Sequence, residues 1–293
     1  MKHRIENKLF SVINTIPNPI IIISSDKLQS VNNAFLNFFN VKSIEEFTKI
    51  NGCIAKLFIQ NNGFFTLSDV KDNSYWSDYL FFHTEINRIV SIQNQDNKIF
   101  DFELTIKKIE NDSEYIIVFN DITKYIAEKN EYKYFAYHDH LTKIYNRQKF
   151  DELFLKEIEN KERYKDHISL LLIDIDHFKV VNDTYGHYIG DLTLIALTKL
   201  ISKDLRINDI FARWGGEEFI ILLPRTDIDA AYIKAQEIRS LVESHVDKEL
   251  PSITISIGVT EMNNSDTTNT CLQRVDKALY LSKEKRNDVV KVI

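Results

Sequence analysis

Arg213-Trp214-Gly215-Gly216-Glu217-Glu218-Phe219 is the stretch that decides how this 293-residue chain folds and where its chemistry lies. Apolar residues at 210 to 212 and 219 to 223 predict a strand on either side of a tight turn. Paired glycines tolerate positive φ and let a ligand approach the backbone. We therefore expect a β-hairpin that presents the carboxylates of Glu217 and Glu218 at its turn. A Gly-Gly hairpin with two merely solvated acids is the alternative interpretation.

Composition limits the classes of protein to which the chain can belong. A hydrophobic content of 44% over this length is enough for two domains that each bury a core. The formal net charge of -6 argues against a general nucleic-acid or anionic-membrane binder. No apolar run approaches the ~20 residues of a membrane span, and the first residues lack an apolar signal core, so we expect a cytoplasmic protein with no membrane span. Cys53 and Cys271 are too few and too far apart for a disulfide framework or zinc site, and we interpret both as structural thiols.

The first half of the chain has the pattern of an α+β domain. Its expected elements are a helix at 5 to 16, a strand at 20 to 23, short helices at 32 to 39 and 43 to 47, and strands at 100 to 107 and 115 to 119. The strand at 100 to 107 alternates strictly between apolar and polar residues, which is typical of a half-buried strand. This order of elements predicts helices on one face of an antiparallel sheet.

Residues 5 to 123 resemble a PAS sensor domain, and we assign that domain to residues 1 to 123. The resemblance rests on the order of the elements, on Asn32-Asn33-Ala34-Phe35 and on Asp121-Ile122-Thr123. PAS domains hold a small ligand, haem or flavin, or simply dimerise. The candidates for a ligand pocket are His83, Trp76 and Tyr79, although a histidine beside aromatic residues is more often part of a packed core. The identity of a ligand does not follow from these residues.

Residues 124 to 137 are expected to form a helical linker. Apolar side chains recur at three, four and seven residues along a narrow stripe made of Ile122, Tyr125, Ile126, Tyr132 and Phe135. The helix either packs on its own domain or forms a two-stranded dimer stalk, whose seam Lys129 and Lys133 would interrupt.

The second half opens with residues 138 to 147, and a helix is expected to follow through about residue 160. An apolar run at 168 to 173 then predicts a central strand covered on both faces. It leads into Asp174-Ile175-Asp176, a metal-site candidate because two carboxylates beside a buried strand are costly without a cation or donors. A turn or a helix cap is the alternative. Further on, Asn182 and Asp191 suit the edge of a guanine, since an amide both donates and accepts and a carboxylate accepts two N–H groups. Asp191 is equally suited to cap a helix at 192 to 205.

Residues 138 to 293 resemble the GGDEF family of diguanylate cyclases. The motifs that match are Gly215-Gly216-Glu217-Glu218-Phe219, Asp174-Ile175-Asp176-His177-Phe178-Lys179, Asn182-Asp183, Gly186-His187, Gly190-Asp191 and the strand at 254 to 259. The resemblance implies a palm fold like that of nucleotidyl cyclases and polymerases, with a βααβ core. It also implies that a homodimer joins two GTP molecules, one per subunit, into cyclic di-GMP with release of two pyrophosphates.

The resemblance also implies roles for residues at matching positions. Mg²⁺, with Mn²⁺ as the other possibility, would bind the carboxylates of Asp174 and Glu217 and the carbonyl of Ile175, which are hard oxygen ligands. Glu217 or Glu218 would accept the proton. The remaining substrate contacts would come from Asn182 and Asp191 at guanine, His187 at the nucleotide, and the backbone of Phe178 and Lys179 with the side chains of Lys283 and Arg286 at the phosphates.

Arg206 and Asp209 match the RxxD site where the product of the family inhibits its own synthesis, although two such residues are also an ordinary surface ion pair. Glu237 occupies the region of a further arginine of that site, with Arg239 nearby. The family's glycine in the opening segment is Lys143 here, and one residue is missing between Lys283 and Arg286. These departures leave a receptor that binds GTP or cyclic di-GMP without turnover as the alternative function.

Overall fold

The computed structural model describes residues 11–61, 63–71, 73–109, 113–164 and 166–293. The chain divides into two compact units, Met1–Glu131 and Tyr132–Ile293. Of the helix expected at 5 to 16, residues 11–15 are helical and the earlier part lies outside the described residues. No helix of the described chain combines the length and the hydropathy that a membrane crossing requires.

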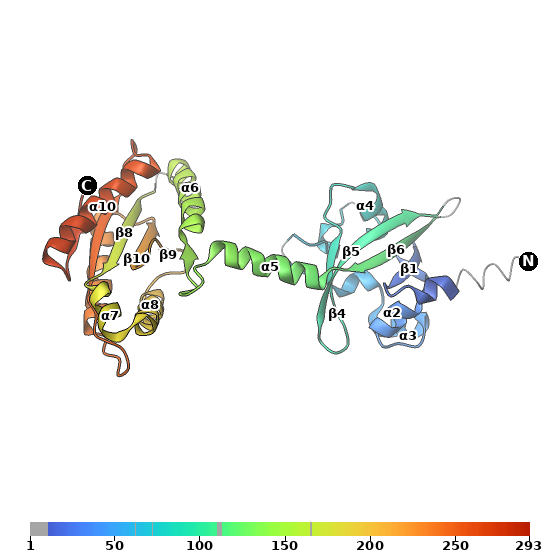
Figure 1. Cartoon of the computed structure of the whole chain (residues 1–293). Helices are drawn as coiled ribbons and strands as arrows, with labels where there is room; N and C mark the ends of the chain where they lie inside the picture. The colour runs from blue at the N-terminus through green and yellow to red at the C-terminus, as the bar shows by residue number, and fades with distance from the viewer. Residues whose placement is uncertain (1–10, 62, 72, 110–112, 165) are drawn as a thin grey trace, which may run out of the picture. The chain divides into compact units, whose positions relative to one another are not determined.

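The first unit contains a six-stranded antiparallel sheet, in the order β2-β1-β6-β5-β4-β3 (Figure 1). Its strands are β1 Ile20–Ser24, β2 Lys27–Val31, β3 Phe58–Ile59, β4 Ile89–Gln93, β5 Ile99–Lys108 and β6 Glu114–Asp121. The helices are α2 Asn33–Phe38, α3 Ile44–Asn51 and α4 Trp76–Phe82, with the short 3₁₀ turns η1 Ile54–Leu57 and η2 Leu67–Asp69. The predicted α+β arrangement is confirmed for this half of the chain.

Alternation along β5 places one set of side chains in the core of the first unit. Phe102, Leu104 and Ile106 are buried, whereas the polar residues between them are exposed. They join a core that is rich in phenylalanine, with Phe35 and Phe47 in edge-to-face contact at 5.0 Å between ring centroids. Such pairs add a favourable quadrupole interaction to the burial of apolar area.

Helix α5 spans Thr123–Tyr137, so the helical conformation predicted for residues 124 to 137 is confirmed. None of its residues is buried, and the rings of Tyr125, Tyr132 and Phe135 are more than half exposed. Within this chain the helix is therefore not packed along an apolar stripe on its own domain.

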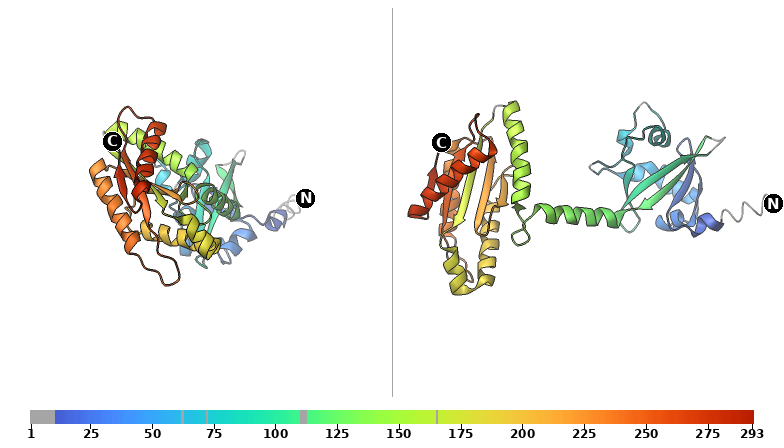
Figure 2. Two further views of the ribbon diagram at one scale, coloured as in Figure 1. Left: turned by 60° about the vertical axis from the view of Figure 1, so that its left-hand side comes forward. Right: turned by 45° about the horizontal axis from the view of Figure 1, so that its top comes forward.

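The second unit is built on a six-stranded sheet in the order β12-β11-β8-β10-β9-β7. Its strands are β7 Tyr145–Asn146, β8 Ile168–Ile175, β9 Ile210–Arg213, β10 Glu218–Pro224, β11 Ile255–Glu261 and β12 Val289–Lys291. Its helices are α6 Arg147–Tyr164, α7 Phe178–Tyr185, α8 His187–Ser202, α9 Ile228–Ser244 and α10 Thr268–Lys285. The order β8-α7-α8-β9 is the predicted βααβ core, and Figure 2 shows the yellow α7 and α8 at one end of this sheet.

Strand β8 is buried along its whole length, as its continuous apolar pattern predicts. Successive side chains of a strand point to opposite faces of the sheet. Leu171 and Ile173 accordingly pack with α7, α8 and α9, whereas Leu170 and Leu172 pack with α6 and α10. By the same alternation Asp174, two residues beyond Leu172, belongs to the face that α10 covers.

Helix α10 approaches β11 closely because Gly258 has no side chain. A Cβ atom at Gly258 would lie 2.2 Å from the backbone nitrogen of Leu279 and 2.5 Å from the carbonyl oxygen of Val275. Along α10 the side chains of Val275 and Leu279 are buried, while Leu272 is only partly buried. Cys271 lies in the same core, as expected of a structural thiol, and Cys53 is half-buried in the first unit.

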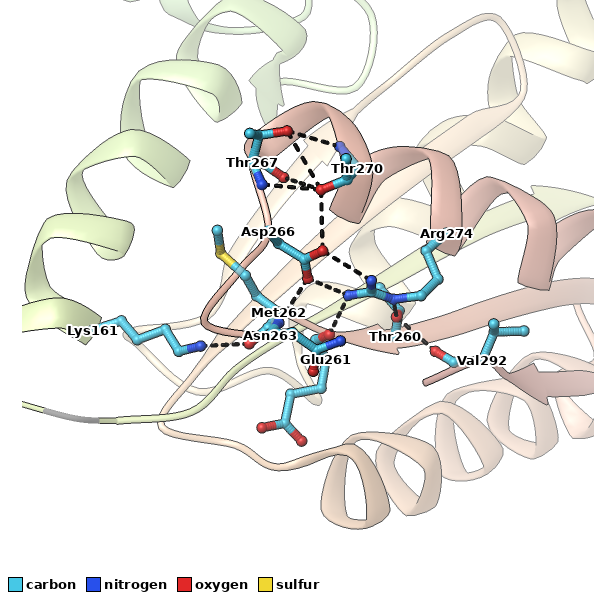
Figure 3. A network of polar contacts seen from close by, with 10 residues as sticks. All are labelled: Lys161, Thr260, Glu261, Met262, Asn263, Asp266, Thr267, Thr270, Arg274 and Val292. Carbon is cyan, nitrogen blue, oxygen red and sulfur yellow. Dashed lines mark hydrogen bonds and ion pairs between the residues drawn. The ribbon is translucent and has the colours of Figure 1, made fainter.

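A polar network holds the start of α10 to the end of β11 (Figure 3). The Arg274 guanidinium donates to both carboxylate oxygens of Asp266, to the Thr260 hydroxyl and to the Glu261 carbonyl. Lys161 of α6 donates to the carbonyl of Met262. In the strand register Glu261 lies opposite Ser169 and Ser256 opposite Asp174, so the network is at the other end of β8 from Asp174.

Candidate active site at the signature turn

The signature stretch forms the expected hairpin. Strands β9 and β10 pair antiparallel, and the backbone amides of Trp214 and Gly215 donate to the carbonyl of Glu218 at 2.8 and 3.2 Å. Neither Gly215 nor Gly216 has a positive φ, so the expectation that this turn needs positive φ is wrong. The structure shows another reason at Gly215, where an added Cβ would lie 2.8 Å from a carboxylate oxygen of Glu218. Gly215 therefore leaves room for the Glu218 side chain.

Arg213 and Asp139 stabilise the turn through hydrogen bonds. The sequence analysis did not identify either residue as part of the site. Arg213 donates to the carbonyls of Gly215 and Gly216 and, at 3.0 Å, to the Asp139 carboxylate. Although burial raises the pKa of Asp139, hydrogen bonds from Thr142 and Arg213 outweigh it and hold the pKa below its usual range. Arg213 belongs to the signature stretch, but Asp139 lies 74 positions away, so no local pattern in the sequence links the two charges.

Asp174 and Glu217 lie beside this turn, at the neighbouring ends of β8 and β10. Asp174 pairs with Glu218 in the strand register and is only 7% exposed. Burial raises its pKa in spite of Lys283, whose ammonium group lies 2.8 Å from one carboxylate oxygen. Burial and then the negative charge of Asp174 raise the pKa of half-buried Glu217 as well. A cation bound here would offset the cost of both negative charges.

Asp176, the other carboxylate of the predicted metal-site pair, does not share this environment. Its oxygens accept hydrogen bonds from the hydroxyls of Thr254 and Ser256, both at 2.7 Å, and from the backbone amide of Asn287 at 2.8 Å. A buried carboxylate with three donors has no need of a metal. The broader expectation that both aspartates belong to a metal site is therefore wrong for Asp176.

A helical pair brings Asn182 close to the residue before Asp191. Gly186, with φ of +82°, ends α7, and α8 begins at the next residue. A Cβ atom at Gly190 would lie 2.0 Å from the side-chain oxygen of Asn182, so the two helices touch at this glycine. Asp191 lies inside α8, not at its start, which excludes the helix-cap interpretation. His187 and Asp191 are both exposed on the pair.

Groups suited to phosphate surround the start of α7. The first amides of a helix, here those of Phe178 and Lys179, have no acceptor within it and favour an anion. Lys283 lies on the last turn of α10, but the helix ends at Lys285, and Arg286 has φ of +59°. Lys283 and Arg286 therefore do not share one helical face. Arg286 instead bends back and donates to the ring of His177 at 2.7 Å, which keeps it beside α7.

The donors beside the turn fit a magnesium or manganese ion. Mg²⁺ is commonly held by one or two carboxylates, with waters and substrate phosphates completing its shell. Asp174 and Glu217 supply two such groups, and the Ile175 carbonyl is adjacent in sequence. Among the described residues no cluster of three or more His, Cys, Asp or Glu side chains is placed to hold a metal. Two carboxylates and one carbonyl leave the rest of a Mg²⁺ shell to water and substrate phosphates.

The Arg206 and Asp209 pair forms a turn at the surface. The Arg206 amide donates to the Asp209 carboxylate at 2.8 Å, and both residues line a groove with Arg225, Lys234 and Glu237. Lys234 in this groove contacts Asp204 at 2.7 Å and Glu237 at 3.5 Å. Arg239 is turned to Glu243 and Asn287 instead, so it does not replace the further arginine.

In the first unit the pocket candidates are packed residues. Trp76 is 1% exposed and Tyr79 is 8% exposed within the core. The His83 ring stacks on Tyr79 at 4.3 Å between centroids and contacts the Tyr79 carbonyl through Nδ1. Trp76 and Tyr79 therefore belong to the packed core, whereas His83 is only half-buried.

The chain is similar to known proteins over its second unit. The family described as "Diguanylate cyclase, GGDEF domain" matches residues 136–288. Diguanylate cyclase DgcM of Escherichia coli is 37% identical over 184 residues, which are 62% of this chain and 45% of DgcM. Diguanylate cyclase A of Treponema denticola is 42% identical over 134 residues, 44% of this chain and 36% of that protein. The chain thus spans less than half the length of these relatives.

Solved structures give the same assignment. The coiled coil and GGDEF domain of DgcB from Caulobacter crescentus, in complex with c-di-GMP, is 30% identical with a TM-score of 0.56 and covers 58% of this chain and 93% of that one. Diguanylate cyclase SiaD from Pseudomonas aeruginosa, in complex with its activator SiaC, is 34% identical with a TM-score of 0.52 and covers 58% of this chain and 67% of that one. From the signature turn, the palm fold and the match over half its length, this chain belongs to the GGDEF family of diguanylate cyclase domains.

Proposed function

We propose that this protein is a diguanylate cyclase that joins two GTP molecules into cyclic di-GMP and releases two pyrophosphates. The observation that carries the proposal is the placement of Asp174 and Glu217 at the neighbouring ends of β8 and β10, where Asp174 is 7% exposed and Lys283 lies 2.8 Å from it. A nucleotide receptor would need the guanine and phosphate contacts, but it would not need a second carboxylate beside a buried one at this turn.

In each step the 3′-hydroxyl oxygen of one GTP attacks the α-phosphorus of the other. The bond from that phosphorus to the oxygen of the β-phosphate breaks, pyrophosphate leaves, and the hydroxyl proton passes to Glu217, Glu218 or water. Mg²⁺ or Mn²⁺ held by Asp174, Glu217 and the Ile175 carbonyl would supply charge neutralisation at the phosphates and a more acidic 3′-hydroxyl. The two attacks close the ring of the product.

The chain itself supplies recognition and orientation. The Asp191 carboxylate can accept the two N–H groups of guanine, and the Asn182 amide can donate to its carbonyl oxygen. His187, exposed on the same helical pair, would hold the nucleotide. The amides of Phe178 and Lys179, with Lys283 and Arg286, would hold the phosphates in line with the attacking group.

We further propose that two chains face each other, because each site binds one nucleotide. In this proposal residues 1 to 123 form a PAS-like sensor, 124 to 137 the linker and 138 to 293 the catalytic domain. The exposed rings of Tyr125, Tyr132 and Phe135 on α5 support a linker that pairs with its copy, and the sensor would set the population of facing dimers. Product bound at Arg206 and Asp209 would inhibit the enzyme.

The test is incubation of the purified chain with GTP and Mg²⁺ and measurement of cyclic di-GMP and pyrophosphate. Glu217→Gln removes a charge from the site at nearly constant volume and should abolish product, whereas Glu249→Gln changes an exposed acid elsewhere and should not. Binding of GTP without turnover by a dimeric protein would contradict the cyclase and favour the receptor. Repeating the assay on a forced dimer of residues 138 to 293 separates a receptor from an enzyme that its sensor holds inactive.

A further inference from the structure

The turn between α10 and β12 has an unusual backbone. Helix α10 ends at Lys285 and β12 begins at Val289, so three residues reverse the chain. Arg286 has φ of +59° and ψ of 164°, and Asn287 has φ of +44°. Asparagine tolerates positive φ, but the conformation of Arg286 is close to a region that is occupied almost only by glycine. Surrounding contacts must therefore hold this turn.

A buried carboxylate supplies the first of these contacts. Asp176 is 6% exposed and accepts the backbone amide of Asn287 at 2.8 Å. The hydroxyls of Thr254 and Ser256 fix the same carboxylate at 2.7 Å each. The position of residue 287 is thus tied to the end of β8 and the start of β11.

Helix α9 supplies the second contact. The Asn287 side chain donates to Glu243 at 2.7 Å and accepts from Arg239 at 2.9 Å. Arg239 and Glu243 also pair with each other at 2.7 Å. Asn287 is therefore held through both its backbone and its side chain.

The constrained turn points the Arg286 side chain toward α7. Arg286 donates to Nε2 of His177 at 2.7 Å, so the neighbouring residues Asp176 and His177 hold the backbone of 287 and the side chain of 286. His177 directly precedes the first turn of α7, whose free amides favour an anion.

We propose that Asp176 and His177 are positioning residues that hold Arg286 where it binds the triphosphate, Asp176 by fixing the strained turn and His177 by orienting the guanidinium. The inference rests on the proposed function, because it needs GTP phosphates at α7. Without the clamp the turn relaxes, and Arg286, an exposed side chain with many rotamers, loses its fixed place beside α7.

The experiment compares Asp176→Asn and His177→Asn with the wild-type chain. Asp176→Asn replaces one carboxylate oxygen by an NH₂ group, so the side chain can no longer accept hydrogen bonds from all three donors. His177→Asn introduces a residue that tolerates the positive φ of 56° at this position, but its shorter side chain does not reach Arg286. Asp266→Asn is the matched control, since it breaks a comparable buried network at the other end of β8. Binding is measured with a GTP analogue whose α- and β-phosphates are joined by a methylene group, and with guanosine.

Both variants should bind the analogue about tenfold more weakly, the loss expected for one charge-assisted contact, with unchanged affinity for guanosine. The control should bind both probes like the wild type. Hydrogen exchange of the peptide that contains the Asn287 amide should speed up in Asp176→Asn alone.

If folded Asp176→Asn and His177→Asn bind the analogue as tightly as the wild type does, the positioning role is overturned. If hydrogen exchange at the Asn287 amide is the same in Asp176→Asn as in the wild type, Asp176 does not fix the turn. Equal losses for analogue and guanosine would indicate general damage and also overturn the positioning role. If the wild type binds neither probe while exchange at Asn287 responds to Asp176→Asn, the proposed function has failed and the nucleotide role of Arg286 with it, although the clamp exists.

Discussion

Lys283 forms an ion pair with Asp174, the carboxylate that is proposed to bind the metal ion. Its Nζ lies 2.8 Å from Asp174 Oδ2, and both side chains are partly or fully removed from water. An ion pair of this kind offsets the cost of a buried charge. A divalent ion and the nucleotide phosphates would compete for the two partners, so Lys283 is expected to pass from the carboxylate to a phosphate as the complex forms.

Lys283→Met is therefore expected to have opposite effects on two affinities. Removal of the ammonium group should strengthen Mn²⁺ binding in the absence of nucleotide by roughly tenfold, since the carboxylate loses its competing cation, and should weaken GTP binding by a similar factor. Manganese electron paramagnetic resonance and equilibrium binding measure the two quantities. Lys285→Met is the control because Lys285 is 78% exposed and its nearest acid is 3.8 Å away. Weaker binding of both ligands would exclude the exchange of partners.

The brace under the signature turn is also a matter of individual residues. Asp139→Asn keeps the size of the side chain but removes the charge that pairs with Arg213 at 3.0 Å. Arg213 donates hydrogen bonds to the carbonyls of Gly215 and Gly216, so loss of its partner should displace the turn and with it Glu217. We therefore expect turnover to fall about tenfold or more, with a smaller change in GTP affinity. Steady-state kinetics separate the two effects. An unchanged kcat would show that the turn holds its shape without the brace.

At the scale of elements, the packing of α10 on β11 depends on the absence of one side chain. Gly258→Ala would place a Cβ atom 2.2 Å from the Leu279 backbone nitrogen, so the helix must move away from the strand. Overpacking of this kind destabilises a protein by roughly 1–3 kcal/mol. Gly216→Ala is the comparison, because no atom lies within 4 Å of the added Cβ. Thermal unfolding should show a lower Tm for the first substitution and little change for the second.

The network between α10 and β11 predicts how stability depends on pH. Hydrogen bonds from Arg274 lower the pKa of Asp266 from 3.8 to about 2 in the folded protein. Because the carboxylate of Asp266 is more acidic in the folded protein than in the unfolded chain, its ionised form stabilises the fold. This stabilisation is complete at pH values above the ordinary carboxyl pKa and is lost as the pH falls from about 4 to about 2.

Asp266→Asn should therefore lower the free energy of unfolding by about 2 kcal/mol at pH 7, and the difference from wild type should shrink toward pH 2. Urea unfolding of both proteins across that range measures it. A difference that stays constant with pH would show that the ionised carboxylate is not what stabilises the junction.

At the scale of the whole molecule, helix α5 joins the two units and leaves its apolar rings in solvent. Tyr132 is 74% exposed and Phe135 is 54% exposed. A second copy of the chain would bury these rings, and a cyclase that needs two facing sites would then work only as a dimer.

Replacement of both Tyr132 and Phe135 by Ser should weaken self-association and lower turnover per chain at low protein concentration. Sedimentation velocity measures the first and cyclic di-GMP production the second, and high protein concentration should restore turnover. Replacement of both Leu155 and Val246 by Ser is the control, because these exposed apolar side chains lie on the second unit outside α5, and it should change neither quantity. A dimer unaffected by the first substitution would place the interface elsewhere.

The sequence by itself predicted the buried strand β8, the alternating strand β5, the helix α5 and the hairpin at 213 to 219, because periodicity and turn residues are local features of the chain. The roles of Asp174, Glu217, Asn182 and Asp191 followed from the resemblance of their motifs to the GGDEF family. The sequence did not predict β3, α4 and β4. Only the tertiary structure showed three hydrogen bonds: from the Asn287 amide to Asp176, from Arg213 to Asp139, and from Arg286, just beyond the end of α10, to His177. Those contacts join residues 111, 74 and 109 positions apart, and the register of the sheet and the end of α10 create them, which no local pattern records.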